Sequence, residues 1–244
     1  MVQKIRAGLK RINRSIEVLI FPSRNCVYST KVYAYHNLSF SQEGEDMILS
    51  KIFGTKNTGF YVDVGAHHPQ RFSNTYRFYL RGWRGINIDA MPGSMDLFKE
   101  LRPEDINLEA AISDSAQELT YYMFDEPALN GFSPEIAANR AGSSRWQLLE
   151  TRFIKTQTLA DILDQYLPLE QKIDFLSIDV EGLDYQVLAS NDWQKYRPKV
   201  VLVEELKTPL SNLALDSKAA NLMQKNGYEL LAKTFNTSFY QIKS

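Results

Sequence analysis

Two short apolar runs of this chain each carry an aspartate at or near their end, and a glycine follows the first. Asp63 lies in the run at residues 60–64, and this run ends directly before Gly65. Asp89 ends the run at residues 85–89. Neighbouring parallel strands end at the same edge of a sheet, where such sheets bind nucleotide-sized ligands. Glycine lets a ligand approach the main chain closely because it has no Cβ. The pairing of the two aspartates favours S-adenosylmethionine (SAM) as the ligand.

Side chains that could accept a proton lie at the same predicted edge. His67 and His68 follow the glycine turn and are two of the three histidines in the chain. Asp179 ends a third apolar run, and Glu181 follows it. Histidine and carboxylate side chains are the common general bases. Consecutive turn residues rarely face the same way, so we expect at most one histidine to reach a bound acceptor. The alternative is that these four are polar turn residues, salt bridges or helix caps.

Two further acids follow the next apolar run. Glu204 ends the run at residues 199–204, which would lie beside the strand of Asp179, and Glu205 follows it. Carboxylate oxygens bind Mg²⁺, and a bound cation makes a hydroxyl easier to deprotonate. Asp179, Glu204 and Glu205 are therefore a candidate Mg²⁺ site, unless Glu205 faces away. Zinc is not expected, because one cysteine and three histidines lack the spacing of a zinc site.

The composition is that of an ordinary globular protein. The 244 residues include 28 Lys+Arg and 29 Asp+Glu, a formal net charge of −1, so nucleic acid is not a favoured partner. One cysteine excludes an internal disulfide and fits a reducing compartment. No apolar run is long enough to cross a bilayer. A signal peptide is not expected, because basic residues interrupt the apolar pattern at the start of the chain. We expect a soluble cytoplasmic protein.

The first 21 residues predict an amphipathic helix. They are basic before Glu17, and their apolar residues fall at helical spacing. Two interpretations remain open: a helix that contacts the inner face of an anionic membrane or a partner, or a surface helix or dimer contact of a homo-oligomer. We expect an N-terminal extension over residues 1–40 and a single domain over residues 41–244.

Strand and helix patterns alternate through that domain. The predicted strands are residues 60–64, 85–89, 106–112, 173–180, 199–204, 228–234 and 238–242. The predicted helices are residues 47–53, 73–81, 94–101, 159–166, 183–188 and 214–226. This alternation predicts an α/β fold with a mostly parallel seven-stranded sheet, helices on both faces and an antiparallel terminal strand. The polar region 125–155 follows the third strand on the ligand side and is expected to be a substrate lid.

Three motifs together resemble the FkbM-type methyltransferases, which are SAM-dependent enzymes with the class I, Rossmann-like fold. They are Asp63-Val64-Gly65-Ala66, Gly82-Trp83-Arg84-Gly85 leading to Ile88-Asp89, and Ile178-Asp179-Val180-Glu181-Gly182. The similarity extends from about residue 41 to about residue 204. The chain departs from the wider class after Ala66, where His67-His68-Pro69 replaces further glycines.

The resemblance implies roles for individual residues. Asp89 would bind the ribose hydroxyls of SAM, and Asp63 would lie near its aminoacyl end. The full set of expected SAM contacts is Asp63, Gly65, Ala66, His67, Asn74, Asp89, Ala90, Glu109, Ala111 and Asp179. The expected catalytic residues are Asp179, His67, His68 and Glu181. Independently of the resemblance, the residue types of Arg140, Arg145, Trp146 and Arg152 in the lid suit a sugar or an anionic acceptor; the alternative is a disordered or oligomer-forming loop.

The favoured function is therefore SAM-dependent O-methylation of a sugar, glycan or other hydroxylated metabolite. A non-catalytic SAM-binding scaffold in a glycan-assembly complex is the alternative. An NAD-linked oxidoreductase is disfavoured, because no Gly-x-Gly-x-x-Gly follows the first strand and Pro69 lacks a backbone donor. Methylation of amide or adenine nitrogen is also disfavoured, because Asp179-Val180-Glu181-Gly182 stands where such enzymes carry an (Asn/Asp)-Pro-Pro-aromatic motif.

Overall fold

The structure, a computed structural model, describes residues 37–143, 145–206 and 217–243. The chain divides into two units, residues 1–38 and 39–244. The helix predicted over residues 1–21, with its membrane or dimer contact, lies outside the described residues. Within the described ranges, no helix is both long enough and apolar enough to cross a membrane.

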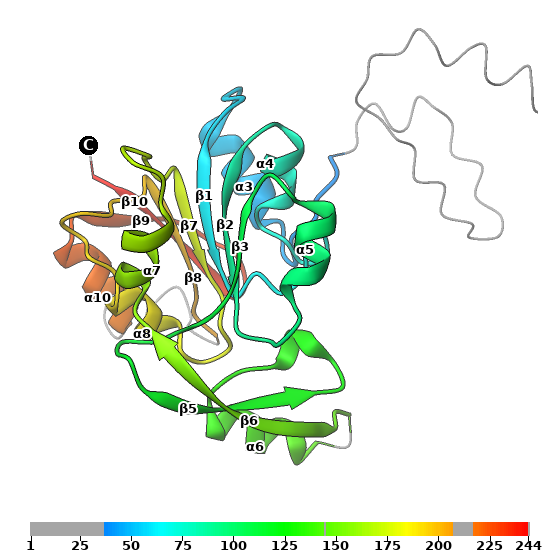
Figure 1. Cartoon of the computed structure of the whole chain (residues 1–244). Coiled ribbons are helices and arrows are strands. Elements are labelled where there is room, and N and C mark those ends of the chain that lie inside the picture. Colours follow the sequence, from blue (N-terminus) through cyan, green and yellow to red (C-terminus); the bar gives the residue numbers. More distant parts are fainter. Residues whose placement is uncertain (1–36, 144, 207–216, 244) are drawn as a thin grey trace, which may run out of the picture. The chain divides into compact units, whose positions relative to one another are not determined.

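A seven-stranded sheet forms the centre of the second unit (Figure 1). Its strand order is β3-β2-β1-β7-β8-β10-β9. The strands are β1 (Phe60–Val64), β2 (Arg84–Asp89), β3 (Ile106–Glu109), β7 (Phe175–Ile178), β8 (Val200–Glu204), β9 (Tyr228–Lys233) and β10 (Thr237–Ile242). β10 runs antiparallel to β8 and β9, and the other neighbours are parallel. The predicted α/β fold, with its seven strands and antiparallel end, is confirmed.

Helices cover both faces of this sheet. Figure 1 shows α3 (Glu45–Phe53), α4 (Tyr76–Leu80) and α5 (Met95–Leu101) on one side, and α7 (Leu159–Tyr166), α8 (Asp184–Ala189) and α10 (Lys218–Lys225) on the other. Side chains alternate along β1, so Tyr61 packs with Leu49 and Phe78, whereas Val62 packs with residues of α7 and α8. All five residues of β1 are buried, as expected for a central parallel strand.

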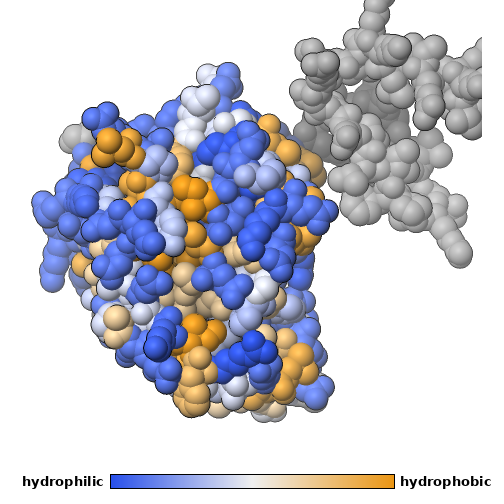
Figure 2. Space-filling view, in the orientation of Figure 1, coloured by the Kyte–Doolittle hydropathy of each residue, from blue (hydrophilic) through white to orange (hydrophobic). Residues whose placement is uncertain are grey.

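A smaller sheet lies beside the main one, with strand order β4-β6-β5. It contains β4 (Ala111–Ile112), β5 (Glu118–Phe124) and β6 (Leu148–Gln157). A 3-10 helix, η2 (Pro127–Leu129), and α6 (Pro134–Ala141) connect β5 to β6. β6 exposes Leu148, Leu149 and Phe153. In Figure 2, apolar groups interrupt the hydrophilic surface over the part of the molecule that β5, β6 and α6 occupy in Figure 1.

Two predicted elements differ from the structure in ways that its hydrogen bonds explain. The helix expected from residue 73 begins at Tyr76, because Ser73 remains outside it and accepts the N–H of Tyr76 through Oγ (3.0 Å). The strand expected over residues 106–112 is divided between the two sheets. Its last bond to β2 is from Ala110 N to Asp89 O (2.9 Å), after which Ala111 pairs with Thr156 of β6.

Candidate functional site

A cleft opens where β1, β2 and β7 end. Val64 is in register with Ile88 of β2 and with Ile178 of β7, so the residues that follow these strands meet at one edge of the sheet. The residues lining the cleft are Gln42, Val64, Gly65, His67, Phe72, Ile88, Asp89, Ala90, Met91, Ala110, Ile112, Tyr121, Pro127, Ala128, Asn130, Phe132, Asp179, Val180 and Glu181. The strand-end edge predicted from the sequence therefore carries a cleft lined by both acidic and apolar residues.

Gly65 makes the tight turn at the bottom of this cleft. Its φ is +83°, in the region that favours glycine. The N–H groups of Gly65 and Ala66 both donate to Ile88 O, at 2.9 and 3.0 Å, which ties the turn to β2. The main chain of Asp179 lies against the other side of the turn, so a glycine is needed at this position.

The Asp89 carboxylate is built into the same turn. Its Oδ2 accepts the N–H of His67 (2.8 Å), and its Oδ1 accepts the N–H of Met91 (2.8 Å). Burial raises the pKa of Asp89, while the two backbone donors oppose that rise. A carboxylate has about four lone-pair sites. After these two bonds, the group can still accept hydrogen bonds from a vicinal diol.

The two adjacent histidines have different surroundings. His67 lines the cleft with φ at +52°, and its Nε2 is buried without a hydrogen-bond partner in the described part of the chain. Burial first, and the charge of Arg71 second, lower the pKa of His67 to about 4, so this imidazole is neutral at pH 7. His68 instead accepts the N–H groups of Gln70 (3.0 Å) and Arg71 (2.9 Å) through Nδ1. Of the two, only His67 is part of the cleft lining.

Three carboxylates meet on the β7–β8 side of the cleft. Asp179, Glu181 and Glu204 each offer one oxygen, and these atoms lie within 4.8 Å of one another. Burial raises the pKa of Asp179 well above its usual range, and Glu181 raises it further. Burial, together with the charge of Asp179, raises the pKa of Glu204 to about 11. Like charges this close do not all ionise, so Glu204 holds a proton at neutral pH.

Glu205 lies apart from this group. Its two oxygens accept hydrogen bonds from Ser217 and from Tyr240. Glu181 supplies the third carboxylate in its place, from a left-handed position at φ +54°. Asp184 fixes that turn by accepting the N–H of Val180 (2.9 Å) and of Gly182 (3.1 Å).

The segment between β5 and β6 closes the cleft on its outer side. Arg140 of α6 donates to Leu129 O (2.6 Å) and to Glu181 Oε2 (2.5 Å). A Cβ added to Gly182 would lie 2.8 Å from the Cβ of Ser133. These contacts dock α6 closely on the loop after β7.

The other residues expected in the lid lie away from the lining. The guanidinium of Arg145 lies 4.7 Å from the centre of the Trp146 ring, and Arg152 pairs with Glu150. Arg140 does lie near the acidic cluster, but Glu181 neutralises its charge.

Several residues expected to touch the cofactor are not part of the lining. Asp63 is buried and accepts a hydrogen bond from Thr75 Oγ1 (2.9 Å). Asn74 donates to Ser177 Oγ (3.1 Å), and Glu109 accepts the N–H of Gly93 (2.7 Å). Ala66 and Ala111 are buried in two small apolar clusters. Gly65, His67, Asp89, Ala90 and Asp179 do line the cleft.

The sequence did not predict several other lining residues, among them Gln42, Phe72, Tyr121 and Phe132. Gln42 lies just before α3, where the polar pattern indicated only a helix start. The position of Gln42 beside the strand ends depends on tertiary packing. In the segment between Tyr121 and Phe132, only the Asn130-Gly131 pair has a sequence pattern that predicts a turn.

The mostly parallel sheet with acids at its strand ends defines a Rossmann-like methyltransferase fold. The sequence model of the methyltransferase FkbM domain matches residues 63–230. The chain therefore belongs to the FkbM methyltransferase family, whose members are transferases that generally use SAM.

A solved structure also shows partial similarity to this chain. Methyltransferase FkbM from Methylobacillus flagellatus KT is 11% identical, with a TM-score of 0.46. The match covers 83% of this chain and 48% of that chain, so this chain spans about half of that protein. No curated protein matches the chain.

Proposed function

We propose that this protein binds SAM in the cleft and transfers its methyl group to a hydroxyl oxygen of a sugar, glycan or other hydroxylated metabolite. The observation that carries the proposal is the meeting of two unlike groups in one cleft. Asp89 and Gly65 lie on one side, suited to a nucleoside. The acidic side chains of Asp179, Glu181 and Glu204 lie on the other, where an ionised carboxylate can remove a proton.

The β2 side of the cleft supports cofactor binding. Asp89 has remaining acceptor sites for the two ribose hydroxyls. Ala110 and Ile112 continue the wall beyond it with apolar surface, which suits the flat face of an adenine. The positively charged sulfonium of SAM would approach the acidic side of the cleft, where opposite charge stabilises it.

The acidic side supports transfer to oxygen. In the proposed step, the acceptor oxygen forms a bond to the methyl carbon, the carbon–sulfur bond breaks, and S-adenosylhomocysteine leaves. The hydroxyl proton passes to Asp179, which lines the cleft beside the half-buried Glu204. A carboxylate near other acids is a stronger base than a solvated one. His67, neutral and with an unpaired nitrogen, is the second candidate base.

A magnesium ion is the alternative occupant of the acidic cluster. Asp179, Glu181 and Glu204 present oxygen ligands of the type that Mg²⁺ prefers, and Glu204 Oε2 is buried without a hydrogen-bond partner in the described ranges. A cation there would supply positive charge that favours the deprotonated acceptor. The role of base would then fall to His67.

The test is formation of S-adenosylhomocysteine from SAM over a panel of neutral sugars and polyols, with Mg²⁺ and with EDTA. Turnover that depends on an added acceptor supports the proposal, and loss of turnover in EDTA supports the cation. Tight SAM binding without turnover on any acceptor would favour the non-catalytic scaffold.

A further inference from the structure

Arg102 is fully buried, directly after α5, and it is anchored on its inner side. Its Nε donates to Asp105 Oδ2 (2.8 Å), and its Nη2 donates to the hydroxyl of Tyr61 on β1 (2.7 Å). A buried guanidinium stays charged and requires such partners. Asp105 is held in turn by the N–H of Gly85 (2.9 Å). The Arg102 guanidinium is therefore fixed to β1 through Tyr61 and to β2 through Asp105 and Gly85.

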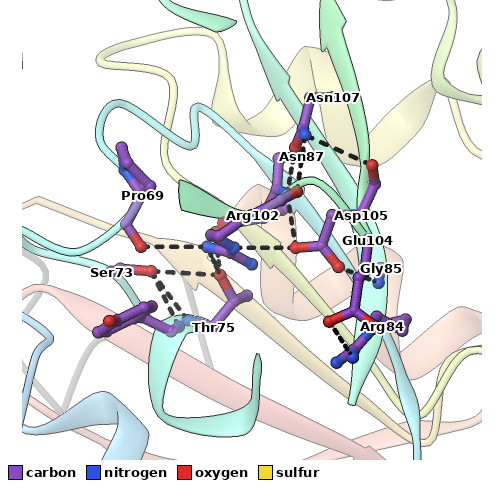
Figure 3. Close-up of polar contacts among 12 residues, drawn as sticks. Pro69, Ser73, Thr75, Arg84, Gly85, Asn87, Arg102, Glu104, Asp105 and Asn107 are labelled. Atoms are coloured by element: carbon purple, nitrogen blue, oxygen red, sulfur yellow. Dashed lines mark hydrogen bonds and ion pairs between the residues drawn. The ribbon is translucent and has the colours of Figure 1, made fainter. Parts of the chain in front are cut away.

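The outer side of the same guanidinium binds the loop after β1 (Figure 3). Arg102 Nη1 donates to Thr75 Oγ1 (3.0 Å) and, at a longer distance, to Pro69 O (3.4 Å). Thr75 Oγ1 then donates to Asp63 Oδ2 (2.9 Å). Burial raises the pKa of the Asp63 carboxyl, and the charge of Arg102 opposes that rise. Nη1 of Arg102 thus contacts the loop at Thr75 and at Pro69. Thr75 in turn donates a hydrogen bond to the Asp63 carboxylate on β1.

That loop contains two backbone conformations that need support. His67 and Phe72 both line the cleft, and their φ angles are +52° and +56°. Residues other than glycine adopt such angles at a cost in free energy, and they persist only where the surrounding structure holds them. Pro69 and Thr75, the two points that Arg102 binds, lie on either side of Phe72.

We propose that Arg102 is a positioning residue for the cofactor cleft. It holds residues 67–75 in the conformation that presents His67 and Phe72 to the ligand, and it acts through Thr75 and Pro69 without touching the ligand. The expected effect of Arg102 on SAM affinity rests on the proposed function, whereas its expected effect on the conformation of residues 67–75 does not.

The test uses Thr75, because a substitution at Arg102 itself risks unfolding the core. Thr75→Val keeps the side-chain shape but removes the hydroxyl that joins Arg102 to Asp63, and Thr75→Ser restores that hydroxyl. In Thr75→Val we expect faster amide hydrogen exchange across residues 67–75 and SAM affinity weaker by about tenfold or more, because the lost hydroxyl bonds to both Arg102 and Asp63. Thr75→Ser should resemble the wild type in both measurements.

Asn107→Ala is the matched control. Asn107 donates to Arg102 O (3.0 Å) and accepts from Asn87 (2.8 Å), so it belongs to the same network but has no hydrogen bond to the loop (Figure 3). This variant should melt at a lower temperature with wild-type SAM affinity and loop exchange.

Two results would overturn the proposal. One is wild-type loop exchange in Thr75→Val. The other is an equal effect of Asn107→Ala on the loop, which would make the network merely structural. If the wild type does not bind SAM, the proposed function fails, and the exchange measurement still decides the role of Arg102.

Discussion

A Cβ added at Gly65 would lie 1.6 Å from the main-chain oxygen of Asp179. The turn after β1 and the end of β7 therefore touch through their backbones, and no side chain fits between them. This contact brings the predicted nucleoside side and the acidic side of the cleft together.

Gly65→Ala is expected to destabilise the fold by about 3 kcal/mol or more, because the clash adds to the cost of a left-handed alanine. SAM binding should be lost with it. Gly93→Ala is the control, since Gly93 has φ +79° but open space around its Cβ position. It should cost only about 1 kcal/mol. Equal losses of unfolding free energy in the two variants would contradict the close contact.

Asp179→Asn is expected to reduce turnover by about 10²- to 10⁴-fold, the usual contribution of a general base. SAM affinity should change much less, because the amide keeps the shape of the side chain. Glu205→Gln is the control, because that carboxylate binds Ser217 and Tyr240 outside the acidic cluster. Steady-state kinetics with a responsive acceptor makes the comparison. Wild-type turnover in Asp179→Asn would move the base to His67.

The Arg140–Glu181 pair should couple the segment between β5 and β6 to the loop after β7. Both side chains are 17% exposed, so solvent screens their attraction only in part. A double-mutant cycle with Arg140→Gln and Glu181→Gln should give a coupling of about 1 to 3 kcal/mol in unfolding free energy. Amide exchange over α6 should rise in either single variant. A coupling near zero would show that the two segments are held by other contacts.

His67 should make the protein less stable in mild acid. Burial lowers its pKa to about 4, below the value of about 6.5 in the unfolded chain. The unfolded state therefore takes up the proton first, and the stability present above pH 6.5 is lost as the pH falls toward 4. His67→Asn removes the titration, and asparagine tolerates the left-handed backbone. Urea unfolding between pH 7.5 and 4.5 should show that the unfolding free energy falls less in this variant than in the wild type. If the unfolding free energy fell equally with pH in the two proteins, His67 would not be the group responsible.

The main sheet could be predicted because its strands are short apolar runs bounded by turns. The second sheet could not. β6 is exposed along nearly all its length and carries charged residues, so neither an apolar run nor an alternating pattern marks it. Its pairing with β5, rather than its own composition, defines it as a strand.

The acidic cluster was only partly predictable, for a geometric reason. Glu204 and Glu205 are consecutive at the end of β8, and consecutive side chains in extended backbone point to opposite sides. One of the two therefore had to face away from Asp179. Glu181 joins the cluster through a left-handed turn, and such conformations are uncommon for residues other than glycine.

The central claim is that the cleft binds SAM, and titration calorimetry of the wild type and Asp89→Ala tests it most directly. We expect SAM to bind the wild type, NAD not to bind, and SAM binding to be lost in the variant, whose fold should be checked by its melting temperature. A folded wild type that shows no SAM binding, or an Asp89→Ala variant that binds SAM as the wild type does, would contradict the account.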